Sequence, residues 1–138
     1  MSKQIWMVRA GRSAVHVDDF IESGHVAVAW RELGELSLPL DRDELERRFD
    51  ERYPRVGKRR RAVHLGQIRR YFNELAVGDP VMTYAPDERL YYLGKITGPV
   101  KWVEDSDLPH QRSVEWTHKV PRDALTDAAD IAPLKAWR

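Results

Sequence analysis

The chain contains no cysteine. Without thiols it can form no disulfide, no thiolate metal site and no cysteine nucleophile. Its five histidines, at positions 16, 25, 64, 110 and 118, include no pair at the i, i+4 spacing that places two metal ligands on one helix face. We therefore expect no structural metal and no cofactor.

The sequence also lacks long apolar runs. No stretch approaches the roughly 18 apolar residues that cross a bilayer, and the N-terminus enters a strand pattern without the apolar segment of a secretory signal. A content of 42% hydrophobic and 33% charged residues is typical of a soluble globular protein. With 138 residues the chain can bury one core, so we expect a single domain, no membrane partner and a cytoplasmic location.

Recognisable catalytic patterns are missing as well. The chain has no glycine-rich phosphate loop, no nucleophile elbow and no paired metal ligands. His110, His118 and the carboxylates of residues 104–107 could form an acid–base set, but solvated side chains of these types are far commoner than catalytic ones. We expect no enzyme within this chain, with a small nuclease or toxin-like enzyme as an alternative.

What the chain does have is a series of short strand-like runs, most of which contain an aromatic residue and end at a turn signal. The predicted strands are residues 5–10, 25–30, 80–84, 90–96, 100–103 and 114–120. The turn-forming residues 85–89 predict a hairpin. Gly78 and Asp79 predict a tight turn in which the carboxylate accepts backbone hydrogen bonds.

Three helices are predicted, at about residues 15–22, 42–53 and 58–74. Asp41 and Glu44 have the spacing of a capping box at the start of the second helix. The third carries an apolar stripe of Leu65, Ile68, Phe72 and Leu75, with cations on its other faces. With the strands, these helices predict an α+β fold, a bent mixed sheet or pseudo-barrel of five to six strands with two to four helices.

A family resemblance rests on four spaced segments, WMVRAG, VAVAWRELGEL, GDPVMTYAPDERLYYLGKITGP and RSVEWTHKVPRDAL. In order and spacing they resemble a PUA-superfamily domain of the EVE-like kind. More narrowly, they are similar to the N-terminal modified-DNA recognition module of Mrr-type prokaryotic restriction endonucleases. The resemblance covers nearly all of residues 1–138, and the basic helical insertion at about 41–75 departs from the best-known members. It implies the N-terminal module of a larger protein.

The resemblance implies a reader of modified DNA. Related EVE and YTH domains bind a modified base, flipped out of its strand, in a pocket with aromatic walls. For this chain it implies base flipping of a methylated or hydroxymethylated cytosine within a modification-dependent restriction system. The implied partners are double-stranded DNA carrying a modified base and a nuclease domain in cis or in trans. An RNA-binding PUA-like domain is the alternative, and the sequence leaves the modified base open.

Aromatic side chains and one turn are the candidates for the base pocket. An aromatic wall contributes about 1–3 kcal/mol per stacked base, and a turn with exposed amides and donors can read a base edge or a phosphate. Trp30 also matches the position where the family places a pocket wall. We predict seven pocket residues: Trp30, Tyr84, Trp102, Tyr92, Arg9, Gly11 and Ser13. Trp6 and Trp116 are expected in the core instead.

Positive charge is concentrated in one segment, because 11 of the 23 Lys and Arg residues lie between Arg42 and Arg70. Acidic residues interleave with the cations of residues 47–52, which favours ion pairs there. No acid is near residues 58–61 in the sequence, which favours phosphate contacts. The predicted contacts to the nucleic-acid backbone are Lys58, Arg59, Arg60, Arg61, Arg69 and Arg70.

Overall fold

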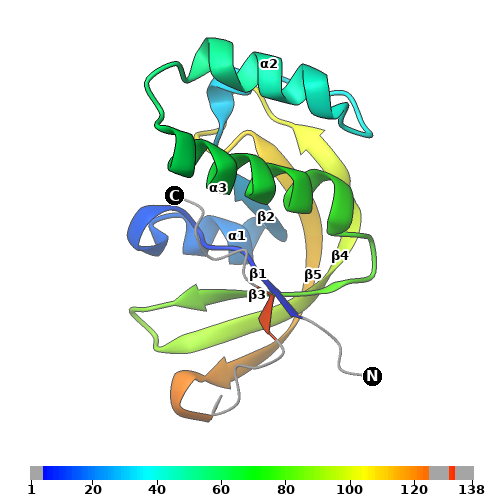
Figure 1. Ribbon diagram of the computed structural model, residues 1–138. Coiled ribbons are helices and arrows are strands. Elements are labelled where there is room, and N and C mark those ends of the chain that lie inside the picture. Colours follow the sequence, from blue (N-terminus) through cyan, green and yellow to red (C-terminus); the bar gives the residue numbers. More distant parts are fainter. Residues whose placement is uncertain (1–4, 125–130, 133–138) are drawn as a thin grey trace.

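The computed structural model describes residues 5–124 and 131–132, which form an α+β fold (Figure 1). The predicted fold class, a bent mixed sheet with helices, is confirmed. In chain order the elements are β1 (Ile5–Met7), α1 (Val17–Ser23), β2 (His25–Val28), α2 (Arg42–Arg52), α3 (Lys58–Arg69), β3 (Pro80–Ala85), β4 (Leu90–Trp102), β5 (His110–Pro121) and β6 (Ile131–Ala132). Short 3-10 turns are η1 (Arg12–Ala14), η2 (Arg31–Leu33) and η4 (Arg122–Ala124), and the π-helical turn η3 (Arg70–Glu74) continues α3.

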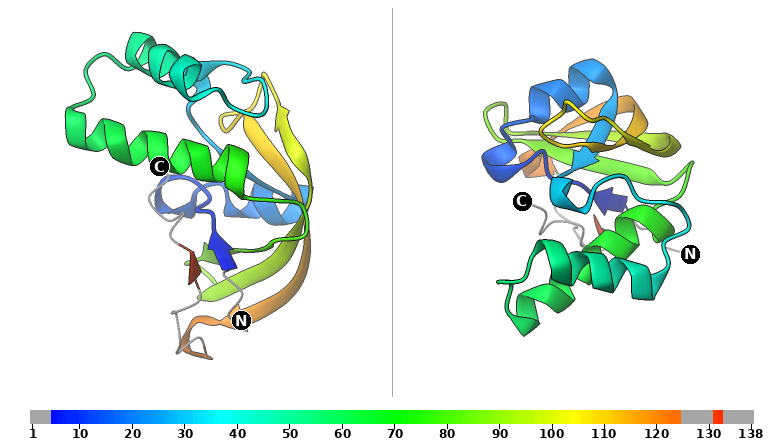
Figure 2. Two further views of the ribbon diagram at one scale, coloured as in Figure 1. Left: turned by 45° about the vertical axis from the view of Figure 1, so that its right-hand side comes forward. Right: turned by 90° about the horizontal axis from the view of Figure 1, so that it is seen from above.

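The described strands form one mixed sheet in the order β2-β5-β4-β3-β1-β6. β1 is parallel to its neighbours β3 and β6, and the other pairs are antiparallel. The predicted hairpin is confirmed, since β3 and β4 pair from Ala85 opposite Leu90 to Pro80 opposite Lys95. The long strands β4 and β5 curve, and α3 lies across their concave side (Figure 2).

β4 bends where the sequence predicts that it ends. Separate strands at 90–96 and 100–103 are wrong, because one strand runs through both and shifts its register against β5 between Ile96 and Val100 and between Leu93 and Gly94. A Cβ atom at Gly94 would overlap the backbone carbonyl of Glu115 on β5. The missing side chain therefore permits a close approach of the two strands, and the register shifts bend the sheet.

The two basic helices follow their predicted spans closely. α2 and α3 begin at Arg42 and Lys58, and the last five residues of the span predicted for the third helix form η3 instead of α-helix. The apolar residues predicted to face the core are all buried: Leu45, Phe49, Leu65, Ile68, Phe72 and Leu75. These helices therefore belong to the same hydrophobic core as the sheet.

The predicted capping box at the start of α2 is wrong. The Asp41 side chain makes no cap hydrogen bond, and the Glu44 carboxylate bonds to Arg47 and Arg48 within the helix. Two guanidinium groups, three and four positions further along the helix, offer this carboxylate ion pairs within the helix, which occupy it in place of a capping bond. The helix still starts as predicted, because acidic Asp43 and Glu44 lie in its first turn, next to the positive end of the helix dipole.

A buried arginine on β5 closes the end of η3. Arg112 is 4% exposed and donates to the carbonyl oxygens of Tyr71, Leu75 and Gly98. Carbonyl groups at a helix C-terminus lack partners within the helix and carry partial negative charge, so a cation stabilises them. The Tyr71 hydroxyl also donates to the carbonyl of His110 at 2.8 Å, so η3 is attached to β5 at two points.

Two tryptophans predicted for the core are half-buried at its edge. Trp6 and Trp116 pack against the core, and their indole N–H groups donate to the Asp79 carboxylate at 3.1 Å and to the Phe20 carbonyl at 2.8 Å. The same carboxylate accepts from the Ala76 backbone N–H at 2.8 Å, which confirms the predicted tight turn. Tryptophan suits such an edge because its ring is apolar and its N–H is polar.

The first two strands are shorter than predicted. β1 ends at Met7 instead of residue 10, and β2 ends at Val28 instead of residue 30. After β1 the chain turns, and the Ala10 carbonyl accepts from the His16 backbone N–H at 2.8 Å. Both strands therefore leave the sheet at neighbouring places, and the residues that follow them meet in the hollow described next.

Candidate nucleic-acid interface

A hollow lies where the chain leaves β1 and β2. It encloses about 240 Å³, including the part open to solvent, and its lining residues are Arg9, Gly11, Ala27, Val28, Ala29, Trp30 and Leu108. The closed part has room for about one water molecule. The structure therefore brings together three predicted pocket residues, Arg9, Gly11 and Trp30.

Trp30 lies at the floor of the hollow and is largely buried, so it does not form an open wall. It is only 8% exposed and belongs to the hydrophobic core. Its indole N–H donates to Nδ1 of His64 on α3 at 3.2 Å, and its backbone carbonyl lies 3.1 Å from Nε2 of His110 on β5. Two imidazoles thus hold Trp30 from opposite elements, one at the side chain and one at the backbone.

Both imidazoles are favoured in their neutral form. Burial lowers the pKa of His110, which is 1% exposed, although the Trp30 carbonyl opposes part of that shift. Burial also lowers the pKa of His64, and the positive charge of Arg60 lowers it further. A neutral His64 that accepts on Nδ1 carries its proton on Nε2. The floor of the hollow is therefore uncharged, whereas the exposed Arg9 brings a cation to its rim.

Unusual backbone conformations are concentrated around the hollow. Among residues 5–124 and 131–132, the non-glycine residues with positive φ are Ser13, Ala14, Trp30 and Arg89. Ser13 and Ala14 lie in the turn that begins at Gly11, and Trp30 lines the hollow itself. Such conformations cost of order 1–3 kcal/mol each and persist where the surroundings enforce them, often at functional sites. Ser13 is exposed on this turn and does not line the hollow.

The other predicted pocket aromatics lie elsewhere. Tyr84 packs against Tyr91 across the β3–β4 hairpin with ring centroids 4.8 Å apart. Tyr92, on the other face of β4, donates to Glu88 and lies under Lys119. These two tyrosines do not line this hollow, because strand register places them near the hairpin turn while the hollow forms where β1 and β2 end.

Trp102 lies near the hollow without lining it. Its ring centroid is 5.1 Å from that of His110, and its indole N–H donates to the Glu104 carboxylate at 3.1 Å. His110 in turn bonds to the Trp30 carbonyl. Trp102, predicted as a pocket wall, is thus one side chain away from the floor of the hollow and packs behind His110.

The first turn of α3 presents cations to solvent. Lys58, Arg59 and Arg60 are exposed and, within the described part of the chain, form no ion pair. No acidic residue lies in this turn, and no side chain caps it. Cations at a helix N-terminus oppose the helix dipole and repel one another, so a bound anion would relieve both effects.

Arg61, also predicted as a phosphate contact, does not share this exposure. Its guanidinium donates to Asp50 at 2.7 Å and to Glu46 at 3.1 Å, and both carboxylates come from α2. The sequence showed no nearby acid because the partners are 11 and 15 residues away and approach only when the two helices pack. Arg69 and Arg70, at the other end of α3, are only partly exposed.

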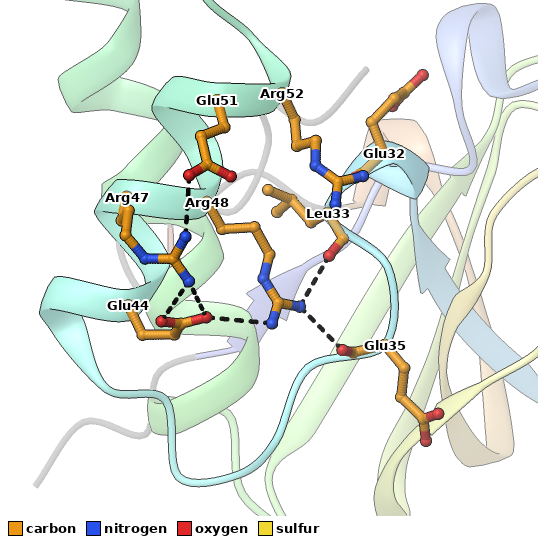
Figure 3. Close-up of polar contacts among 8 residues, drawn as sticks. All are labelled: Glu32, Leu33, Glu35, Glu44, Arg47, Arg48, Glu51 and Arg52. Carbon is orange, nitrogen blue, oxygen red and sulfur yellow. Dashed lines mark hydrogen bonds and ion pairs between the residues drawn. The ribbon is translucent and has the colours of Figure 1, made fainter.

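The arginines of α2 are occupied within the protein (Figure 3). Arg47 pairs with Glu44 and Glu51, which confirms the expectation of ion pairs in residues 47–52. Arg48 donates to the backbone carbonyls of Leu33 and Glu35, in the segment that follows β2. Arg52 donates to the backbone carbonyl of Glu32 in the same segment. These bonds attach α2 to η2, directly after Trp30, so they help to fix one side of the hollow.

The structure does not assemble the acid–base set considered from the sequence. His110 and His118 lie eight positions apart on one strand, a separation of roughly 25 Å at the usual rise per residue. His110 is buried, whereas His118 is exposed and lies 2.8 Å from the Thr117 hydroxyl. No group of three or more His, Asp or Glu side chains among the described residues could hold a metal ion.

The sequence analysis did not predict Leu108, which lines the hollow, or His64, which contacts Trp30. Leu108 interrupts an otherwise polar loop. A lone apolar residue in such a loop indicates that its side chain packs against the protein, here at the hollow. His64 lies one residue before Leu65 of the apolar stripe, so helical spacing places it beside the core. Its bond to Trp30 joins residues 34 positions apart, which no local pattern reveals.

Comparison with known proteins gives one result. A family model with the description Domain of unknown function (DUF8426) matches residues 6–132. No curated protein and no solved structure matches the chain. Within the described ranges, no helix has both the length and the apolar character needed to cross a membrane.

Proposed function

The chain belongs to the DUF8426 family, and we propose that it is a nucleic-acid-binding module that receives a modified base at the hollow and holds the backbone with the first turn of α3. The observation that carries this proposal is the contact, through His64, between the first turn of α3 and the hollow. Arg60, which forms no ion pair with any residue that the structure describes, lies one helical turn before His64, and His64 bonds to Trp30 in the hollow. Cations and hollow are therefore adjacent on the folded protein.

The proposed ligand is double-stranded DNA in which one cytosine is methylated or hydroxymethylated. The resemblance to EVE-like, PUA-superfamily modules supports this choice, as does the acid-free lining of the hollow with one exposed arginine at its rim. Guanidinium donors suit a base edge that presents acceptors. A flipped base would displace the rim formed by Arg9 and Leu108 and recover stacking in the hollow.

The proposal extends to the biological setting. We assign no catalytic step to this chain, and place the module in a modification-dependent restriction system of the cytoplasm, in which a nuclease domain in cis or in trans cuts the recognised DNA. Lys58, Arg59 and Arg60 would contribute salt-sensitive affinity that does not depend on sequence. The hollow would contribute the preference for one base.

The test is a binding comparison between short duplexes that differ only in one cytosine, which is unmodified, methylated or hydroxymethylated. Fluorescence anisotropy at several salt concentrations should show tighter binding to a modified duplex. Arg9→Gln should weaken binding to the modified duplex, about tenfold if the guanidinium makes a bidentate contact to the flipped base, and should leave the fold intact because Arg9 is exposed at the rim and forms no ion pair among the described residues.

Arg122→Gln is the matched control. Arg122 is also exposed and forms no ion pair in the described structure, but it lies just beyond the opposite end of β5. The control should keep the preference for the modified base. Equal binding of all duplexes would reject the modified-base proposal, stronger binding of a matched RNA would favour the RNA-binding alternative, and metal-dependent cleavage by the pure protein would favour an enzyme.

A further inference from the structure

His64 occupies the junction between the cationic turn and the hollow. Its imidazole accepts the Trp30 indole N–H at 3.2 Å, and the two rings meet edge to face with centroids 5.9 Å apart. From α2 the Phe49 ring packs against the same imidazole, also at 5.9 Å. The side chain is thus held between three elements: α3, α2 and the end of β2.

The contact with Trp30 requires one particular state of His64. Only an unprotonated Nδ1 can accept the indole N–H, and a protonated imidazolium has no acceptor. The neighbours that face His64 are the Trp30 indole from the end of β2, the Phe49 ring from α2, and Arg60 from α3 itself. No carboxylate of the described residues acts on it to favour the imidazolium.

Trp30 depends on such support because its backbone is strained. Its φ of 47° and ψ of 43° lie in the left-handed region, which a bulky residue occupies at an energetic cost. The surroundings oppose relaxation at two points, the His110 contact on the carbonyl and the His64 contact on the indole. Loss of the second contact would remove one constraint on the ring that forms the floor of the hollow.

We propose that His64 is a positioning residue: it fixes the Trp30 indole in the hollow and so links the cationic turn of α3 to the base-binding site. The link to binding rests on the proposed function, whereas the positioning of Trp30 does not. Protonation of His64 removes its acceptor and adds positive charge beside Arg60. Acid should therefore weaken the preference for a modified base while attraction to the phosphates persists or grows.

The direction of the pH effect follows from burial. Burial lowers the pKa of His64 below its ordinary value of 6.5, so the contact is intact near neutral pH and is lost as the pH falls through that lowered pKa. The expected window therefore lies below pH 6.5.

Nuclear magnetic resonance of the Trp30 indole N–H tests the positioning role without any nucleic acid. The resonance, assigned through Trp30→Phe, should shift with pH in the native protein as His64 titrates. In His64→Asn it should stay close to its neutral-pH position throughout, because Oδ1 of asparagine is attached to Cγ like Nδ1 of histidine and accepts without titrating. In His64→Phe, which keeps a ring and lacks an acceptor, it should be displaced at every pH.

An indole resonance in native protein that ignores pH from neutral down through the His64 titration, or that is identical in His64→Phe, would overturn the inference. If the resonance behaves as expected, the binding assay of the previous section is repeated at neutral and acidic pH. The native preference for the modified duplex should fall severalfold on acidification, and that of His64→Asn should not. If the Trp30 indole resonance shifts with pH but the protein shows no preference for the modified duplex at any pH, the proposed function is rejected and the positioning role of His64 is retained.

Discussion

At the scale of single residues, Arg112 is the clearest case of a charge used inside the protein. Its guanidinium serves three carbonyl groups, two of them at the end of η3. We predict that Arg112→Ala lowers the free energy of unfolding by about 3 kcal/mol or more, because the carbonyls lose a charged donor and the vacated space is buried. Urea denaturation at neutral pH measures the change.

Two further variants separate this role from a general effect of charge. Arg112→Lys keeps the charge but lacks the forked donors, so it should recover only part of the stability. Arg55→Ala removes an exposed arginine between α2 and α3 and should change the free energy of unfolding by less than about 0.5 kcal/mol. Equal losses in Arg112→Ala and Arg55→Ala would contradict the assignment.

His110 gives the fold a dependence on pH. Its buried imidazole lies against the Trp30 carbonyl, and burial lowers its pKa below the ordinary 6.5. The unfolded chain therefore binds this proton more readily, so the stabilisation is complete above pH 6.5 and is lost as the pH falls through the lowered pKa. His110→Gln keeps a side-chain N–H donor and does not titrate.

We predict that the native protein loses more free energy of unfolding between about pH 7.5 and about pH 5 than His110→Gln does. Urea denaturation at the two pH values provides the comparison. An identical loss in both proteins would mean that His110 does not contribute to the pH dependence.

Single residues also show what the sequence could and could not predict about the site. Arg9, Gly11 and Trp30 were predictable because each stands where a strand pattern stops, and strand ends border openings in a sheet. Tyr84 and Tyr92 were predicted for the pocket but lie away from this hollow, because residue type alone does not say on which part of a sheet an aromatic lies. His64 joins the site through a contact 34 residues away, which depends on how α3 packs.

At the scale of the elements, α2 and α3 both carry several arginines but differ in net charge, because α2 also contains five acidic residues and α3 contains none. The arginines of α2 are bonded to carboxylates and carbonyls, whereas the first turn of α3 ends in exposed, unpaired cations among the described residues. Arg60 and Arg61 are adjacent in sequence, yet Arg61 pairs with two acids of α2. Substitutions of Arg60 and Arg61 therefore compare, among the described residues, an unpaired and a paired arginine on the same helix.

We predict that Arg60→Gln weakens binding to every duplex and reduces the slope of log affinity against log salt by about 0.9, the value for one lost phosphate contact. Arg61→Gln should leave that slope nearly unchanged, because its guanidinium is already bonded. Affinities at four or more salt concentrations give the slopes. A larger effect from Arg61 than from Arg60 would contradict the assignment of these cations.

The extent of the elements was predicted well where local chemistry decides it. The hairpin turn and the starts of α2 and α3 follow from turn residues and apolar spacing, which act over a few positions. The length of β4 was not predicted, because its continuation past Gly98 and Pro99 depends on pairing with β5. Strand pairing of this kind is a long-range property.

At the scale of the whole molecule, the basic segment predicted as an insertion shares the core of the sheet. Leu45, Phe49, Leu65 and Ile68 belong to the same buried set as Val26, Ile96 and Val114. Arg48 adds bonds between α2 and the carbonyls that follow β2. We therefore predict that helices and sheet unfold together in one transition.

The five tryptophans make this testable, because all lie outside residues 41–75. Trp30 itself contacts His64 on α3, so the measurement uses a Trp30→Phe background, in which tryptophan fluorescence reports on the remainder of the chain while far-UV circular dichroism follows the helices. The two urea curves should coincide, and Leu65→Ala should shift both by about 2–5 kcal/mol. A helical transition that precedes the tryptophan transition would show that the basic segment folds as a separate unit.

The close approach at Gly94 has a consequence for how relatives of this chain should be compared. Any sequence that keeps the same bend must keep glycine there, so invariance at this column of an alignment would record the contact between β4 and β5. Arg9 is exposed and the fold does not require its charge. Conservation of arginine at that column would therefore reflect selection for binding, and the two positions together separate evolutionary constraint on architecture from constraint on recognition.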